Sequence, residues 1–350
     1  MGQTSEDAAA RGVGTTASER PVQRWRHLVH VPPHAGPADR EVAVLFKTQR
    51  REASILGGMR LGIGLPAAVP DTEMTLVGRW AAEAERAGFA SVGVIDRLVY
   101  DNLDPLTALA AAAASTSRIE LLSTVVNVCW RNNPVLLAKQ LASVARLSGG
   151  RLTAGLGMGG WPADYAAGGV PLAGRGARFE SALATMQRAW QATGGRPRLL
   201  LGGTVRASFA RAATAGSEGW VAPLFGLALL QEGGAAVRRA WSAAGRQGQP
   251  RIVTGRYFSL GPDANETADA YIHHYYGTDY FEHARADTLT DPEQLRAELQ
   301  RLSEAGCDDV VLFPCVGDLE QVALVAQVLR SGGTTPGDPG VSQVSPPDKS

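Results

Sequence analysis

A strand that runs into alternating glycines is the segment of this sequence most suggestive of ligand chemistry. Between residues 152 and 161 an apolar run passes into Gly155, Gly157 and Gly159, with Met158 between the last two. Glycine has no Cβ, so the backbone there can approach a flat or phosphorylated ligand closely. We therefore expect the backbone of Met158 and Gly159 to face a bound small molecule.

A second glycine turn has the features of an anion site. Gly202, Gly203 and Thr204 lead from an expected strand at 198–201 into an expected helix at 206–215. Free N–H groups and the positive dipole end at a helix start attract negative charge. We predict a phosphate site at these three residues, with Arg206 as a counter-charge. A tight turn that merely requires glycine is the alternative.

The acid–base candidates are few. Asp96 follows an expected strand at 91–95, and the histidines outside the first 57 residues are His273, His274 and His283. A histidine titrates near neutral pH, so His274, on a segment that could cover the pocket, is a candidate acid or base. Packing of a helix is the alternative for it. Since no histidine pair has metal-site spacing with a carboxylate, we expect no metal.

Strands and helices alternate along most of the chain. Apolar strands are expected at 60–66, 91–95, 119–126, 152–156, 198–201, 219–222, 252–259 and 309–313. Helices are expected at 72–87, 105–115, 134–147, 178–192, 206–215, 227–244, 267–276, 292–305 and 319–329. Eight strand–helix units of similar spacing predict a single α/β domain, a (β/α)8 TIM barrel, in preference to an open doubly wound sheet. A dinucleotide-binding turn is disfavoured, because no helix begins directly after the glycines.

The ends of the chain differ from this pattern. Residues 1–57 are polar and aperiodic, so we expect a mostly disordered N-terminal extension, then the barrel over 58–330 and a flexible tail over 331–350. Met59 directly precedes the first expected strand and is a candidate start of translation. A native protein whose mass included residues well before Met59 would refute that start.

Composition excludes several classes of protein. The 350 residues carry 34 basic and 34 acidic side chains, so charge indicates no nucleic-acid partner. No apolar run is long enough for a bilayer and the N-terminus is not signal-like, so we expect no membrane association. Three cysteines without metal-site spacing are typical of a reducing cytoplasm.

Several short motifs, in their order and spacing, resemble the luciferase-like monooxygenase superfamily, whose members are flavin- and deazaflavin-dependent barrel oxidoreductases. The resemblance covers about Arg60 to Leu329. Its pieces are residues 83–89, Asp96-Arg97, 117–121, 131–134, 145–152, 155–159, Asp164-Tyr165, Arg175, 178–180, Gly202-Gly203, Ala212-Ala213 and Gly219-Trp220.

The resemblance implies a flavin-type cofactor over the barrel mouth. It implies a bulge at Thr124, Val125 and Asn127, often with a non-proline cis peptide, that supports the back of the isoalloxazine ring. Ordinary strand packing is the alternative for these residues. Met158 and Gly159 would follow the ring edge and the ribityl chain.

One position departs from the family pattern. Relatives often carry histidine after the acid that ends the second strand, and here Arg97 stands there. Guanidinium keeps its charge at any working pH, so Arg97 cannot transfer protons as histidine does. It could instead stabilise an anionic reduced flavin or a substrate carboxylate, and we count it with Asp96 and His274 as a catalytic candidate.

Three functions follow from these features. The first is an oxidoreductase, with reduced FMN and oxygen favoured for monooxygenation of a small organic substrate and a flavin reductase as partner. Coenzyme F420 with hydride transfer is its alternative, for which Arg131, Arg175 and Arg206 could hold the acidic tail. The second is a non-catalytic flavin-binding or partner subunit. The third, a phosphate-binding aldolase or isomerase, is disfavoured, because Lys139 is the only lysine inside the barrel. The helices at 105–115 and 134–147 could form a homodimer face.

Overall fold

A computed structural model describes residues 54–56, 58–214 and 216–331 of the chain. The expectations for residues 1–53 and 332–350 lie outside the described residues. The described chain begins earlier than the expected barrel boundary at residue 58. Strand β1 (Ser54–Leu56) pairs antiparallel with the first barrel strand, so these three residues belong to the sheet and not to an extension.

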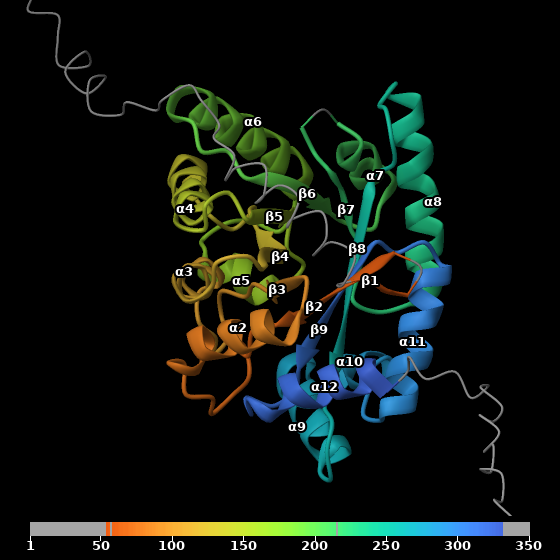
Figure 1. Cartoon of the computed structure of the whole chain (residues 1–350). Coiled ribbons are helices and arrows are strands. Elements are labelled where there is room, and N and C mark those ends of the chain that lie inside the picture. The colour runs from red at the N-terminus through yellow and green to blue at the C-terminus, as the bar shows by residue number, and fades with distance from the viewer. Residues whose placement is uncertain (1–53, 57, 215, 332–350) are drawn as a thin grey trace, which may run out of the picture. The chain divides into compact units, whose positions relative to one another are not determined.

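Eight parallel strands close into a barrel, which confirms the predicted fold (Figure 1). In chain order they are β2 (Met59–Gly64), β3 (Ser91–Val94), β4 (Glu120–Asn127), β5 (Leu152–Gly157), β6 (Arg198–Gly202), β7 (Gly219–Val221), β8 (Arg251–Phe258) and β9 (Asp309–Pro314). Each strand pairs with the next, and β9 returns to β2 through Arg60–Asp309 to Ile63–Leu312. The strands are almost wholly buried, as expected where helices cover a parallel sheet.

Helices follow every barrel strand and surround the sheet (Figure 1). They are α2 (Leu76–Ala87), α3 (Pro105–Ser115), α4 (Pro134–Leu147), α5 (Pro162–Ala167), α6 (Arg175–Thr193), α7 (Arg206–Ala212), α8 (Leu227–Ala243), α9 (Ala264–Tyr276), α10 (Thr278–Ala286), α11 (Pro292–Glu304) and α12 (Glu320–Ser331). Two of these were not expected from sequence, α5 after β5 and α10 after α9.

Local signals explain why α3 and α4 match their predicted bounds. Each helix begins with proline at its first position, where the missing N–H is not needed. The Asp104 carboxylate accepts hydrogen bonds from the amides of Leu106 and Thr107 at 3.0 and 3.1 Å, and Asn133 caps α4 in the same way.

The ring of Phe313 fills the barrel interior near the end where the strands terminate. A Cβ on Gly64 would lie 2.3 Å from the Phe313 ring, and a Cβ on Gly255 would lie 2.9 Å from it. On β3, a Cβ on Gly93 would lie 3.4 Å from the same ring. Gly64 and Gly255 therefore leave room for the ring of Phe313, whereas a Cβ on Gly93 would first meet Val311, at 2.5 Å.

Charged residues close the opposite end of the barrel, where the strands begin. The carboxylate of Glu120 accepts a hydrogen bond from Arg60 at 2.9 Å and forms an ion pair with Arg198 at 3.0 Å, and Arg251 donates to both Glu120 and Asp309 at 2.8 Å. Burial alone would raise the pKa of Glu120, but the surrounding arginines outweigh it and lower this pKa to about 2.

Candidate active site

A bulge in β4 shapes the end of the barrel where the strands terminate. The pairing of β4 with β5 shifts register between Ser123 and Val126, and the Thr124–Val125 peptide bond is cis. Both features expected at this position are present. Val125 is partly exposed, whereas Thr124 is 5% exposed and directs its hydroxyl toward the carbonyl of Val94. Val125 is therefore the side chain of the bulge that can face a ligand.

The alternating glycines face this bulge. A Cβ on Gly155 would lie 2.1 Å from the Ser123 carbonyl oxygen, and one on Gly157 would lie 2.4 Å from Val125 Cγ2. A Cβ on Gly159 would lie 3.3 Å from the Asn127 side chain. The glycines on β5 therefore make room for the bulged strand β4, and ligand approach is not needed to explain them.

The end of β6 also packs against Val125. A Cβ on Gly202 would lie 3.0 Å from Val125 Cγ1, so Val125 stands between glycines of β5 and β6. We call Val125, Gly157 and Gly202 the shelf. Met158 and Gly159 are partly exposed beside it, and the Met158 carbonyl accepts a hydrogen bond from Tyr165.

The predicted phosphate residues lie next to the shelf, in a less open arrangement than expected. Gly203 has φ +136°, and a Cβ there would lie 2.6 Å from Ser208 Cβ, so its own turn requires glycine. Thr204 and Arg206 are exposed. Thr204 lines a cavity of about 260 Å³ together with Glu232, whose negative charge opposes an anion there. The backbone at Gly202 and Gly203 is thus a better candidate for anion contact than this cavity.

Asp96 lies behind the bulge and not on the open surface. Its Oδ2 accepts from the Asn127 amide at 2.7 Å and from Arg131 at 3.1 Å, while the Asn127 side chain donates to the Asp96 carbonyl. Its Oδ1 is buried and has no partner among the described residues. Burial raises the pKa of Asp96 to about 6, although Arg131 and the Asn127 amide oppose this.

Arg97 is held by a carboxylate and an aromatic ring. Its Nε donates to Asp164 Oδ2 at 3.0 Å, and its guanidinium lies 3.9 Å from the centre of the Trp161 ring. The side chains of Arg97 and Asp164 are 7% and 1% exposed. Arg97 is therefore held in place by internal partners in this structure.

Aromatic side chains from three loops and α9 converge next to Arg97. Tyr100, Tyr275 and Trp161 surround its guanidinium, and Trp161 lies 5.9 Å from Tyr276 between ring centres. Phe225 lies 5.4 Å from Tyr276. We define these five residues as the aromatic cluster, which packs with Val125 in one apolar group. In the sequence, the run of two histidines and two tyrosines at 273–276 marks the α9 part of this cluster.

His274 joins the aromatic cluster through Tyr100. The Tyr100 hydroxyl lies 2.7 Å from His274 Nδ1, and Tyr100 is also 5.6 Å from the Arg97 guanidinium. His274 is exposed. The structure therefore brings His274 and Arg97 to one tyrosine, whereas Asp96 contacts Arg131 and Asn127.

The residues of the shelf fit a planar cofactor with an anionic end. Val125 offers a partly exposed surface at the end of two glycine-bearing strands, and Asp96 Oδ1 is an orphaned polar atom behind it. Trp161 and Tyr276 supply aromatic walls.

Among the described residues no group of three metal-ligating side chains occurs. Within the same described ranges no helix is long and apolar enough to span a membrane.

The protein family to which this barrel belongs follows from its sequence. A model of the luciferase-like monooxygenase family matches residues 59–335. The chain belongs to this family.

Two curated relatives match parts of this chain, and one of them has a named activity. An F420-dependent glucose-6-phosphate dehydrogenase of Beutenbergia cavernae is 36% identical over 121 residues, which are 31% of this chain and 34% of the relative. An uncharacterised protein of Mycobacterium tuberculosis is 32% identical over 134 residues, 32% of this chain and 46% of the relative. The chain thus matches less than half the length of these relatives.

A solved structure shares the whole barrel. The oxygenating constituent of 3,6-diketocamphane monooxygenase from Pseudomonas putida, in complex with FMN, superposes with a TM-score of 0.60 at 16% identity. The match covers 78% of this chain and 96% of that one. At this identity the likeness concerns the fold alone.

Proposed function

We propose that this chain is an oxidoreductase that binds a reduced flavin-type cofactor on the shelf, with reduced FMN as the first candidate and a small organic molecule as the substrate. The observation that carries the proposal is Val125, partly exposed on the bulge between glycines of β5 and β6. Family membership supports the same conclusion.

The proposed roles follow from where the side chains lie. Val125 supports the back of the ring, and the backbone of Met158 and Gly159 follows its edge. Gly202 and Gly203, with Thr204 and Arg206, hold the anionic end. Reduced FMN supplies the electrons for the reaction with oxygen. The protein binds and orients it and keeps water away with Trp161 and Tyr276.

In this proposal His274 transfers protons, because the guanidinium of Arg97 keeps its charge and its internal contacts. His274 is exposed and can exchange protons with solvent, while Tyr100 links it to the aromatic cluster. Asp96 and Asn127 act as positioning residues that hold the bulge from behind.

Coenzyme F420 with hydride transfer is the second candidate. The named activity of the Beutenbergia cavernae relative favours it. FMN stays first because an acidic F420 tail needs cations, and Arg131, one of three arginines considered for that tail, is bound to Asp96. Arg175 and Arg206 are the other two.

Equilibrium titration with oxidised and reduced FMN and with F420, read by fluorescence, tests the proposal. We expect micromolar binding of one cofactor. Val125→Glu should abolish it, because a carboxylate would occupy the ring surface, while Leu147→Glu, at a position 66% exposed on α4, should not. Binding of neither cofactor would overturn the proposal. Binding without turnover would favour a non-catalytic partner subunit.

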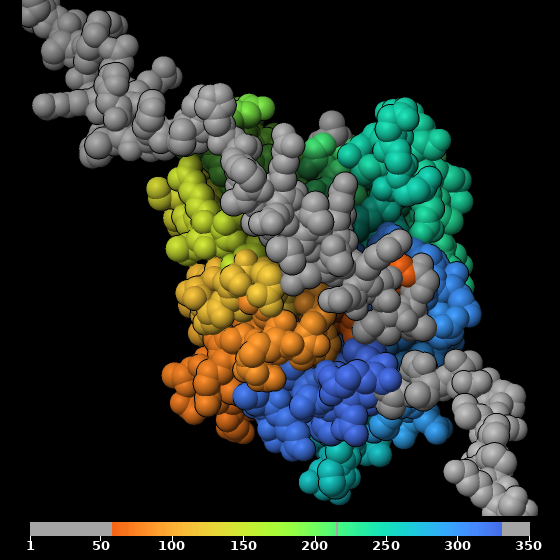
Figure 2. Space-filling model, in the orientation of Figure 1, coloured from red at the N-terminus to blue at the C-terminus, as the bar shows by residue number. Residues whose placement is uncertain are grey.

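Two further parts of the proposal concern partners. A flavin reductase would supply reduced FMN, and α3 and α4 would form a homodimer face, where Val135 and Leu136 are 53% and 50% exposed. Figure 2 shows these helices, amber to yellow-green, side by side on one surface. Sedimentation should show a dimer that Leu136→Glu dissociates. The three buried free cysteines support a reducing compartment, in keeping with the proposed cytoplasmic location.

A further inference from the structure

Three partly exposed aromatic side chains pack on the same buried apolar group as Val125 of the shelf. They are Trp161 from the loop after β5, Phe225 from the loop after β7, and Tyr276 from α9. The ring centres of Trp161 and Phe225 lie 5.9 and 5.4 Å from that of Tyr276. We call these three residues the ring wall. Partly exposed aromatic rings of this kind line small-molecule sites.

The loop that carries Phe225 is held by three hydrogen bonds. Thr254 and Arg256, both buried, donate to backbone carbonyls of this loop at 2.7 and 2.6 Å. The carboxylate of Asp287 accepts a hydrogen bond from the amide of Gly226 at 2.7 Å. A ring that is fixed in this way loses little conformational freedom when a ligand binds, so the loop favours binding.

The cation position on the ring wall is already occupied. The guanidinium of Arg97 lies 3.9 Å from the centre of the Trp161 ring, and its Nε donates to Asp164 at 3.0 Å. A cationic ligand would meet the charge of Arg97, and an anionic ligand would find that charge neutralised by Asp164. His283, which lies 5.7 Å from Phe225 between ring centres, is exposed to solvent. Since a charged group that leaves water needs a compensating charge, the ring wall favours an uncharged ligand.

The hydroxyl of Tyr276 can donate a hydrogen bond to a ligand. The hydroxyls of Tyr257 and Tyr276 lie 3.0 Å apart, and neither has another partner among the described residues. One of them donates to the other, so the second O–H is left over. Tyr257 is fully buried, whereas Tyr276 is partly exposed. Because an unpaired donor costs most where neither water nor a ligand can reach it, Tyr257 is the donor and the proton of Tyr276 is available.

We infer that the ring wall is the substrate site of the proposed oxidoreductase and that the substrate is an uncharged aromatic molecule with an acceptor oxygen. Its ring packs against Trp161 and Phe225, and its oxygen accepts the hydrogen bond that Tyr276 can donate. The ring wall shares its apolar group with Val125, the residue proposed to support the cofactor ring. The inference therefore rests on the proposed function for its reaction, but binding itself needs no cofactor.

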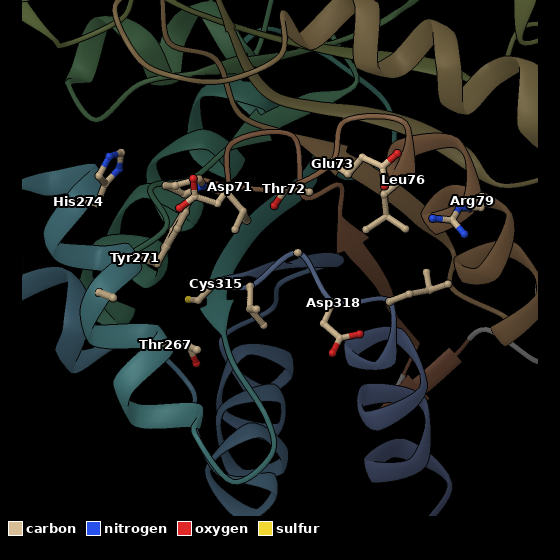
Figure 3. A pocket seen from close by; sticks show the side chains of 16 residues that line it. Asp71, Thr72, Glu73, Leu76, Arg79, Thr267, Tyr271, His274, Cys315 and Asp318 are labelled. Atoms are coloured by element: carbon tan, nitrogen blue, oxygen red, sulfur yellow. The ribbon is translucent and has the colours of Figure 1, made fainter.

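A cleft of about 840 Å³ elsewhere in the molecule fits this substrate less well. It shares no lining residue with the shelf or the ring wall. Figure 3 shows Asp71, Glu73 and Asp318 among the side chains around it. Ionised carboxylates only accept hydrogen bonds, so these side chains cannot donate to an acceptor oxygen. The cleft is therefore a suitable control position for binding experiments.

Equilibrium dialysis of the full-length protein without cofactor tests the inference. The probes are 2-acetylnaphthalene, 2-ethylnaphthalene, 2-naphthoate and 2-(aminomethyl)naphthalene at pH 7, which share a fused aromatic body and differ in charge and in the acceptor oxygen. We expect the ketone to bind at least about tenfold more tightly than the carboxylate and the ammonium ion, because the charged probes lose hydration. Equal binding of charged and uncharged probes, or binding of none, would overturn the inference.

Variants locate the binding. Phe225→Leu keeps an apolar side chain and should weaken binding of the ketone about fivefold, because it removes an aromatic contact. Ala270→Trp, at an exposed position that lines the cleft of Figure 3, should not weaken it. Thermal unfolding of each variant shows that the fold is kept. Undiminished binding in Phe225→Leu, or loss of binding in Ala270→Trp, would refute the ring wall as the site.

Tyr276→Phe tests the hydrogen bond. It should reduce the ratio of the affinities for 2-acetylnaphthalene and 2-ethylnaphthalene about fivefold, because only the ketone accepts from the hydroxyl. The control is Tyr280→Phe, at a tyrosine on α10 that is 59% exposed, and it should leave this ratio unchanged. An unchanged ratio in Tyr276→Phe would refute the acceptor oxygen.

The outcome separates this inference from the proposed function. Probe binding with these preferences but without any cofactor binding would keep the ring wall as an aromatic binding site and overturn the flavin proposal, and with it the role as substrate site. Cofactor binding without these preferences would keep the proposed function and overturn the inference.

Discussion

Arg97 stands where the family resemblance led us to expect histidine, and its surroundings explain what this cation does. Asp164 neutralises it, and Trp161 lies 3.9 Å from its guanidinium. A desolvated cation–π contact contributes about 2 kcal/mol, and loss of one partner from a buried ion pair costs about 3 kcal/mol or more. Arg97 therefore fixes Trp161 and the Asp164 loop beside the mouth, which is a positioning role.

A double-mutant cycle on Arg97 and Asp164 tests this role. Arg97→Met and Asp164→Asn should each lower the free energy of unfolding by about 3 kcal/mol, because each leaves a buried partner. The loss of unfolding free energy in the double variant should be smaller, by at least about 1 kcal/mol, than the sum of the losses in the two single variants. Urea unfolding of the four proteins gives these values, and strictly additive losses would contradict the pairing.

The buried carboxylate of Asp96 predicts a pH dependence of stability. Its folded-state pKa is raised from 3.8 to about 6, so its contribution to stability is fully present below pH 3.8 and is lost as the pH rises through 6. At about 1.4 kcal/mol per pKa unit this amounts to about 3 kcal/mol. Asp96→Asn keeps an acceptor for the Asn127 amide but does not titrate.

Urea unfolding at pH 4, 5.5 and 7 measures this effect. The wild type should lose stability relative to Asp96→Asn as the pH rises across this range. A constant difference between the two proteins would show that Asp96 ionises as freely when folded as when unfolded.

At the scale of elements, the site depends on the fit of β4 into β5 and β6. The extra length of the bulge turns Val125 toward its neighbours, and glycine is the residue type that leaves room for it. A Cβ at position 157 would come within 2.4 Å of Val125, closer than atoms can pack. The glycine pattern and the bulge are therefore one structural unit.

Alanine substitutions test this unit. Gly157→Ala should destabilise the protein by about 2 kcal/mol, because the added methyl overlaps Val125. In a Val125→Ala background the same change should cost less than about 0.5 kcal/mol, since Cγ2 is gone. Gly160→Ala, with nothing within 4 Å of its Cβ, is the matched control and should be neutral. An equal cost of Gly157→Ala in both backgrounds would contradict the fit.

At the scale of the whole molecule, the barrel is closed differently at its two ends. Charges fill the end where the strands begin, and Phe313 and the aromatic cluster fill the end where they terminate. Removal of one partner from a buried ion pair leaves the other charge buried and uncompensated, which destabilises the fold. The charged end is therefore the place where acid should weaken the barrel.

Glu120→Gln tests the charged end. At pH 7 it should cost about 3 kcal/mol, because three arginines lose a shared anion. The pKa of Glu120 is depressed from 4.5 to about 2, so its contribution is present above pH 4.5 and is lost as the pH falls toward 2. The difference from wild type in urea unfolding should shrink over that range. Glu180→Gln, which breaks only an exposed pair with Arg211, should change stability by less than about 1 kcal/mol at every pH.

The sequence predicted the barrel and most element bounds, because periodicity, proline starts and caps are local signals. Helix α3 was found to the residue for that reason. The packing of α9 against the mouth depends on contacts such as Tyr100 with Tyr275, 175 positions apart, which no local pattern contains. The glycines on β5 were noticed but assigned to a ligand, because their partner, the bulge of β4, is visible only in the folded sheet.

The ring of Phe313 is buried in the barrel interior near the end where the strands terminate. Because Gly64 and Gly255 lack side chains beside it, truncation of this one residue would open a cavity there while the neighbouring strands stayed unchanged. Larger guests could then be accommodated by adjusting a single position at the centre of the barrel, without redesigning any of the loops.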